Sequence, residues 1–135
     1  MDEIDKQGVR LEHAFLYITD VERSLRFYRQ AMPAWIVRWD GLGYGGKRWI
    51  HWGPPGDGQP GYLSLCEIRD PDAKAPDDET LGVRHIGFAH PDVSALVERL
   101  AKEGLRPSDR TEDDRYRRVY FEDPDGNELE FVQEL

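Results

Sequence analysis

Cysteine is almost absent from this 135-residue chain, because Cys66 is the only one. A single cysteine excludes a disulfide within the chain and is typical of proteins in a reducing compartment. The chain has no apolar run long enough to cross a bilayer, and its first residues are charged and acidic, unlike a signal peptide. The sequence therefore predicts a cytoplasmic protein without a membrane partner.

Positive charge is scarce as well. The 18 Lys and Arg residues are outweighed by 27 Asp and Glu, which gives a formal net charge of −9. Nucleic acid favours a basic surface, and the chain has no basic stripe and no base-stacking motif, so we expect no nucleic-acid partner. With 39% hydrophobic residues, we expect residues 1–135 to form one domain with its own core.

The first half of the chain shows one helical pattern among strand patterns. After a loose lead-in at residues 1–9, Asp20 is expected to cap a helix that Pro33 ends. Alternating side chains predict strands on both sides of this helix, at residues 10–19, 35–40, 48–53 and 62–68. An acidic, Pro-containing linker at residues 69–82 follows.

The second half repeats this order. A strand is expected at residues 83–89, a helix after Asp92, a short strand between residues 105 and 110, and a hairpin at residues 116–132. The hairpin turns at an Asp-Pro-Asp-Gly-Asn segment.

Two histidines mark the repeat. His13 lies seven residues before Asp20, and His85 lies seven residues before Asp92. An internal repeat of this kind predicts a duplicated architecture. We therefore expect two strand–helix–strand–strand–strand modules, at residues 10–68 and 83–134, which pair to enclose a cup.

Three stretches carry a family resemblance: residues 13–28, 84–88 and 121–131. They resemble the vicinal oxygen chelate superfamily, which is the glyoxalase / bleomycin-resistance / extradiol-dioxygenase group, over roughly residues 10–134. The resemblance implies an α+β fold of two βαβββ modules whose curved mixed sheets form a cup. This is the architecture that the repeat predicts. The resemblance also implies a homodimer.

The resemblance further implies a metal site. In metal-dependent members the first and last strands of each module offer ligands, and His13, His85 and Glu130 fall on three of these positions. Ser64 falls on the fourth, where glyoxalase-like members often have Glu. Glu67 lies nearby, on the opposite face unless a β-bulge rotates it. Two imidazoles and a carboxylate suit one divalent ion of Fe, Mn, Ni, Co or Zn.

Other side chains have two interpretations each. The resemblance implies that Glu130 can also act as a proton shuttle. His51 is either an acid or base in the cup or an ordinary histidine. Arg115, Arg117 and Arg118 are either a solvated edge or an anchor for an anionic substrate. Trp39, Tyr44, Trp49 and Trp52 are either packing or an aromatic wall. Further candidates to line the pocket are Ser64, Cys66, Trp49 and Tyr120.

Two functions stay open at this point. One is a metal-dependent enzyme whose small-molecule substrate chelates the ion through oxygen atoms, by lyase or isomerase chemistry or by extradiol-type dioxygenation. The other is a non-catalytic protein that resembles bleomycin-resistance proteins and sequesters a small molecule. Ser64 argues against the glyoxalase I reaction in particular, because that position lacks a carboxylate.

Overall fold

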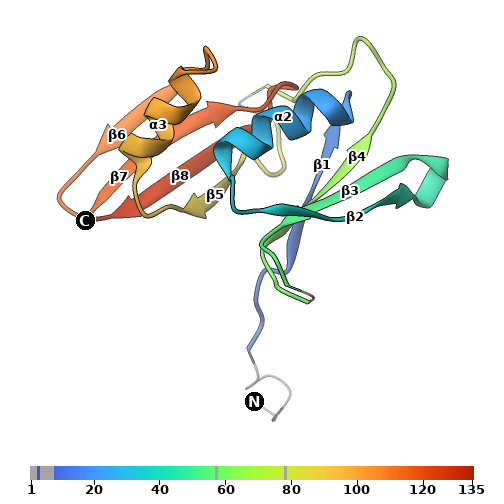
Figure 1. Cartoon of the computed structure of the whole chain (residues 1–135), viewed down its shortest axis with the longest axis horizontal. Coiled ribbons are helices and arrows are strands. Elements are labelled where there is room, and N and C mark those ends of the chain that lie inside the picture. The colour runs from blue at the N-terminus through green and yellow to red at the C-terminus, as the bar shows by residue number, and fades with distance from the viewer. Residues whose placement is uncertain (1–2, 4–7, 57, 78) are drawn as a thin grey trace. The chain divides into compact units, whose positions relative to one another are not determined.

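The computed structural model describes residues 3, 8–56, 58–77 and 79–135. The chain divides into two compact units, one of Met1–Tyr17 with Ala34–Glu67 and one of Ile18–Pro33 with Ile68–Leu135. Each unit is built on one four-stranded sheet (Figure 1). The lead-in expected at residues 1–9 falls mostly outside the described residues, as do Asp57 and Asp78.

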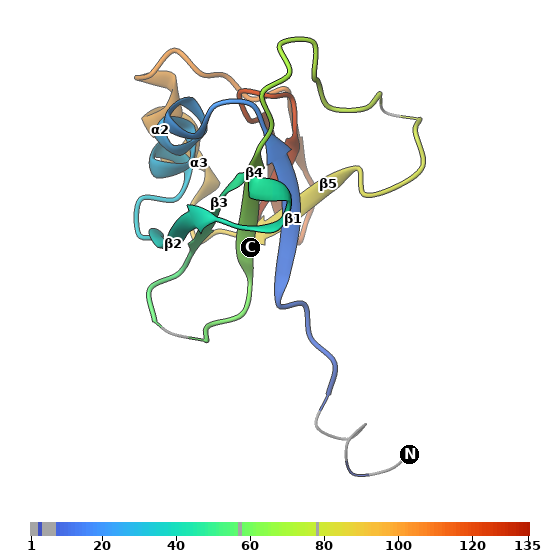
Figure 2. The ribbon, with the colours of Figure 1, turned by 90° about the vertical axis from the view of Figure 1, so that its right-hand side faces the viewer.

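The first unit is built on a sheet with the strand order β1-β4-β3-β2. Its elements are β1 (His13–Ile18), β2 (Ile36–Leu42), the short 3-10 turn η1 (Tyr44–Gly46), β3 (Arg48–Gly53) and β4 (Tyr62–Glu67). β1 runs beside β4 (Figure 2). β3 is antiparallel to both of its neighbours. These strands confirm the order expected for the first module.

The two faces of this first sheet differ in burial. The side chains of one face are almost completely buried: Ile50, Trp52, Leu63 and Leu65. Because successive side chains of a strand point to opposite faces, the neighbouring residues form the other face. Trp52 is therefore a core residue and does not belong to an aromatic wall.

The second unit contains both helices and the second sheet. Its elements are α2 (Val21–Ala31), β5 (His85–Ala89), α3 (Val93–Ala101), β6 (Asp109–Glu112), β7 (Tyr116–Glu122) and β8 (Glu128–Glu134). The strand order is β5-β8-β7-β6, with β5 parallel to β8. α3 covers one face of this sheet (Figure 1). The core of the second unit consists of buried apolar side chains, among them Leu96, Leu100, Phe121, Leu129 and Phe131.

α2 belongs to the second unit, although the sequence places it in the first module. The Arg99 guanidinium of α3 donates a hydrogen bond from Nε to the Gln30 carbonyl at the end of α2, at 2.7 Å. This bond supplies a partner for one of the carbonyl groups that a helix end leaves open. None of the described helices is long and apolar enough to span a membrane.

The two predicted helix caps are confirmed. Asp20 Oδ1 accepts a hydrogen bond from the Arg23 backbone N–H at 3.0 Å, and Asp92 Oδ1 accepts one from the Ala95 N–H at 3.0 Å. The strand expected at residues 105–110 lies slightly later, as β6. Pro107 has no N–H to donate to a strand ladder, which explains the later start.

Removal of the first cap has a defined expected cost. Asp20→Ala is expected to lower the free energy of unfolding by about 1 kcal/mol, because the Arg23 N–H loses its acceptor. Asp20→Asn retains an acceptor oxygen and is expected to lose less than half of that. Urea denaturation of the three proteins measures the difference, and equal losses in the two variants would show that capping is not the cause.

Candidate functional site

His85 and Glu130 are brought together by two neighbouring parallel strands of the second sheet. The register places His85 opposite Glu128 and Gly87 opposite Glu130. His85 Nε2 lies 3.0 Å from Glu130 Oε2, and its Nδ1 lies 3.7 Å from Glu128 Oε1. A Cβ added at Gly87 would lie 3.6 Å from Glu130 Oε2. Glycine therefore leaves this carboxylate oxygen uncovered on the β5 side.

The other oxygen of Glu130 is held by β7. The Tyr120 hydroxyl donates a hydrogen bond to Glu130 Oε1 at 3.2 Å, and Arg118 Nε lies 3.4 Å from the same oxygen. Burial, followed by the charge of Glu130, raises the pKa of Tyr120, so its hydroxyl keeps the proton that it donates. One carboxylate oxygen is thus anchored in the sheet, while the other faces His85.

The geometry of this pair suits a metal ion. When two donor atoms each lie about 2.1 Å from one ion, and the two metal–ligand bonds form a right angle, the donor atoms are about 3 Å apart. This agrees with the 3.0 Å between His85 Nε2 and Glu130 Oε2. In the described part of the chain, no group of three or more His, Cys, Asp or Glu side chains is arranged to hold an ion. The same distance is that of a hydrogen bond between an imidazole and a carboxylate, so the pair could supply two ligands but is short of a complete metal site.

His13 lies in the first unit, with a carboxylate partner of its own. Its Nδ1 lies 3.0 Å from Glu12 Oε1, and the same oxygen accepts the Tyr62 hydroxyl at 3.1 Å. These two hydrogen bonds lower the pKa of Glu12. In the tautomer with the proton on Nδ1, this nitrogen donates to Glu12 and Nε2 keeps its lone pair. The sequence did not indicate Glu12, because adjacent residues of a strand are expected on opposite faces.

Ser64 and Cys66 of β4 are buried, with exposed fractions of 4% and 0%. β1 and β3 flank β4, and their Phe15 and Trp49 rings stack at a centroid distance of 5.0 Å. The Trp49 ring comes from the position paired with Cys66. The two rings therefore meet over β4 and cover its small side chains. Burial also raises the pKa of the Cys66 thiol, which disfavours the reactive thiolate.

Glu67 does not share the face of Ser64. The β3–β4 register runs without a shift from Leu63 to Cys66, so no bulge rotates the following residue. The side chain of Glu67 follows Cys66 in the alternation and points to the opposite face from it. The interpretation that a bulge brings Glu67 round is wrong for this strand pair.

His51 packs among rings on the open face of the first sheet. Its ring centroid lies 5.4 Å from that of Trp39 and 5.0 Å from that of Tyr62. Burial, and then the neighbouring His13 and Arg38, lower the pKa of His51. The surroundings of this imidazole thus favour its neutral form. A neutral imidazole can accept a proton, and its ring faces make it part of the aromatic surface.

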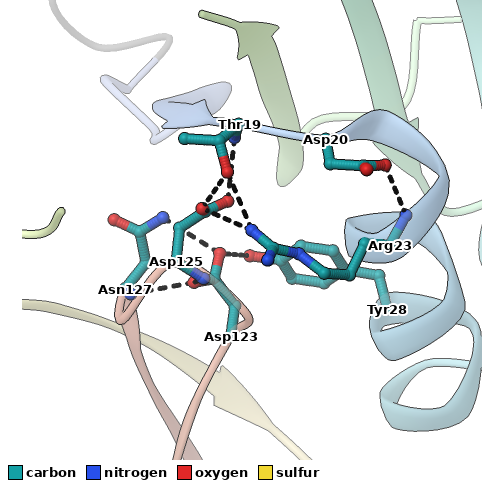
Figure 3. A network of polar contacts seen from close by, with 7 residues as sticks. All are labelled: Thr19, Asp20, Arg23, Tyr28, Asp123, Asp125 and Asn127. Carbon is teal, nitrogen blue, oxygen red and sulfur yellow. Dashed lines mark hydrogen bonds and ion pairs between the residues drawn. The ribbon is translucent and has the colours of Figure 1, made fainter. Parts of the chain in front are cut away.

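The turn that leads into β8 is fixed by a polar network (Figure 3). Asp123 is 4% exposed, and its Oδ1 accepts the backbone N–H groups of Asp125 and Asn127 at 2.9 and 2.8 Å. Its Oδ2 accepts the Tyr28 hydroxyl at 2.8 Å and Asn127 Nδ2 at 2.9 Å. Tyr28 belongs to α2, so the network ties this helix to the turn before Glu130.

A second carboxylate of the turn contacts the first turn of α2 and the residue before its cap. Asp125 Oδ2 accepts the Thr19 backbone N–H at 3.0 Å, and Asp125 Oδ1 lies 2.9 Å from Arg23 Nη2 (Figure 3). The sequence indicated the turn from its Pro, Gly and Asn residues. It did not indicate these contacts, whose partners lie about a hundred residues earlier.

Comparison with known proteins gives one family. The model of the Glyoxalase/Bleomycin resistance protein/Dioxygenase superfamily matches residues 10–131. A comparison with curated proteins finds no match.

Solved structures share the fold. A glyoxylase/bleomycin resistance protein/dioxygenase domain from Frankia sp. EAN1pec has a TM-score of 0.77 at 24% identity, over 95% of this chain and 99% of that one. Leishmania major glyoxalase I has a TM-score of 0.76 at 20% identity, over 93% and 87%. TnmS3, an antibiotic-binding protein from Streptomyces sp. CB03234, has a TM-score of 0.70 at 23% identity, over 95% and 98%.

Proposed function

Because the chain belongs to the Glyoxalase/Bleomycin resistance protein/Dioxygenase superfamily, we propose that it is a metal-dependent enzyme acting on a small molecule. The substrate chelates one divalent ion of Fe, Mn, Ni, Co or Zn through oxygen atoms. The observation that carries the proposal is the separation of 3.0 Å between His85 Nε2 and Glu130 Oε2. The two reaction classes that it supports are lyase or isomerase chemistry and extradiol-type dioxygenation.

The ligand set that we propose is His13, His85 and Glu130. The last two are neighbours in the second sheet, and His13 holds the position in the repeat that matches His85. A metal ion bound to such a set polarises substrate oxygens and stabilises the negative charge that develops on them. Two imidazoles and one carboxylate leave positions for those oxygens.

Glu130 has a second role in this proposal. Its Oε2 faces His85, while its Oε1 accepts the Tyr120 hydroxyl and lies near Arg118. We assign Oε2 to metal binding, and we propose that the Glu130 carboxylate also exchanges a proton with the substrate. The Tyr120 hydroxyl and the Arg118 guanidinium hold the carboxylate in one orientation through Oε1.

We also propose a cytoplasmic homodimer. The scarcity of cysteine, with Cys66 as the single one in the sequence, supports the compartment. The dimer is supported by the resemblance, and light scattering at micromolar concentration measures the mass that it predicts.

The test of the proposed function is metal retention. Protein freed of metal with a chelator is reloaded with each of the five ions in turn, and iron is handled without oxygen. Wild type is expected to retain about one ion per chain after dialysis for at least one metal. His85→Ala is expected to bind that metal at least about 100-fold more weakly, because Glu130 loses its partner ligand. Elemental analysis and equilibrium dialysis measure both quantities.

A matched histidine variant serves as the control. His90 lies in the same unit, where its Nδ1 accepts the Asp92 N–H. His90→Asn retains an acceptor and is expected to leave metal affinity within about threefold. Circular dichroism checks the fold of each variant. If wild type retains a stoichiometric amount of none of the five ions, this result contradicts the proposal of a metal-dependent enzyme and supports ligand sequestration without catalysis.

A further inference from the structure

The open face of the first sheet is lined by rings from all of its strands. Neighbouring ring centroids lie 4.7–5.4 Å apart. Phe15, Tyr17 and Trp39 are 44%, 53% and 43% exposed. The complete set is His13, Phe15, Tyr17, Trp39, Trp49, His51 and Tyr62. Exposed apolar surface gathered on one face of a sheet marks a binding surface.

The fold itself does not need these rings. The second sheet has the same strand order, and its residues match those of the first by the repeat and by the strand registers. Phe15, Tyr17, Trp49 and Tyr62 of the first sheet correspond to Gly87, Ala89, Arg118 and Glu128 of the second. The equivalent positions thus carry two small residues and two ionic ones. His13 and His51 correspond to His85 and Tyr120, which also carry rings. Because the second sheet forms without rings at the other four positions, the fold does not require them there, and they are available for a ligand.

Two glycines allow the tryptophans to lie close along the backbone. A Cβ added at Gly41 would lie 2.8 Å from Trp39 Cζ2, and one added at Gly43 would lie 2.8 Å from Trp49 Cδ1. Side-chain carbons do not approach so closely, so any larger residue would push the indole away. Trp49 Nε1 also donates to the Tyr44 carbonyl at 3.3 Å, which orients its ring. The indoles are thereby held near the sheet instead of projecting freely.

The size of this face limits what it can hold. Four strands about 4.8 Å apart span about 14 Å, and the three ring positions of β1, each two residues from the next, extend about 14 Å along the strand. An area of this size matches a planar molecule of two or three fused rings. A stable protein partner would need about 800 Å² on each side.

We propose that this face binds a planar aromatic ligand of two or three fused rings. The rings of the ligand stack on Trp39 and on the Phe15–Trp49 pair, because offset stacking of aromatic planes is favourable. One part of this proposal rests on the proposed function: the substrate is then a fused-ring aromatic molecule whose oxygen atoms chelate the metal. The ring site itself does not depend on the metal.

The test separates the ring site from the metal. Metal-free protein is titrated by calorimetry with 2,3-dihydroxynaphthalene, which is planar and has neighbouring oxygens. trans-Cyclohexane-1,2-diol has neighbouring oxygens without an aromatic plane, and it is expected to bind at least about tenfold more weakly. Trp39→Leu and Phe15→Leu each remove a ring but keep an apolar side chain, and each is expected to weaken naphthalenediol binding about tenfold.

The control is Tyr44→Leu. The Tyr44 side chain is 91% exposed and lies outside the stacked set, so it does not belong to the aromatic wall considered from the sequence. The substitution keeps the Tyr44 carbonyl that accepts from Trp49 Nε1. The variant is expected to bind within about twofold of wild type. Unchanged binding in both Trp39→Leu and Phe15→Leu, or equal affinity for the two diols, would overturn the ring site. Ring-dependent binding that added Co(II) leaves unchanged supports the ring site and counts against the metal proposal.

Discussion

Asp123→Ala is expected to lower the free energy of unfolding by about 4 kcal/mol, which is among the larger effects of a single substitution. The carboxylate is 4% exposed and accepts four hydrogen bonds. Alanine removes the carboxylate that accepts from the buried Tyr28 hydroxyl and from two backbone N–H groups. Loss of the acceptor of a buried polar group costs about 1–3 kcal/mol. Urea denaturation monitored by circular dichroism measures the loss.

Two smaller substitutions separate the contributions to this loss. Tyr28→Phe removes one hydrogen bond and is expected to cost about 1 kcal/mol, whereas Asp123→Asn keeps one acceptor oxygen and is expected to fall between the other two variants. A loss below 1 kcal/mol in Asp123→Ala would show that water replaces the carboxylate. The network would then not fix the turn before β8.

The contribution of Asp123 to the free energy of unfolding also depends on pH. Burial raises its pKa, and the hydrogen bonds from Asn127 and Tyr28 oppose the rise without cancelling it. The folded state therefore binds the proton more strongly than the unfolded state. This contribution to stability is fully present below the ordinary pKa of aspartate and is lost as pH rises through the folded pKa. Asp123→Asn has no carboxyl group at this position and is expected to lack this pH dependence. The free energy of unfolding of wild type, relative to that of Asp123→Asn, should therefore fall as pH rises from the ordinary pKa of aspartate through the folded pKa.

Glu130→Gln is expected to lower metal affinity at least about 100-fold. The substitution replaces the charged oxygen beside His85 Nε2 with a neutral amide, and a neutral group is a weaker ligand for a divalent ion. Tyr120→Phe removes the hydroxyl that holds the other oxygen and is expected to lower affinity about tenfold. Competition with a chromogenic chelator measures these constants.

Glu128 offers the matched control for this prediction. It is two residues from Glu130 on the same face and lies 3.7 Å from His85 Nδ1, which is the nitrogen that we do not assign to the metal. Glu128→Gln is expected to change affinity less than about threefold. Equal losses in the two glutamate variants would indicate a general effect of negative charge and would contradict a ligand role for Glu130.

Local patterns in the sequence predicted much of the architecture. The strands follow from alternation, and both helix starts follow from Asp20 and Asp92, whose partners are only three residues away. The matched spacing of His13 and His85 predicted the repeat, and both sheets show the same strand order. The pairing of His85 with Glu130 is the part of the predicted ligand set that lies within one unit.

The sequence by itself thus determined the order of the elements and the residues at matching positions, because both depend on neighbours along the chain. Only the tertiary structure decided which side chains meet across strands. It stacks Phe15 on Trp49, and it brings Tyr28 to Asp123. These contacts join residues 34 and 95 positions apart, and their geometry depends on strand register and packing, which no local pattern specifies.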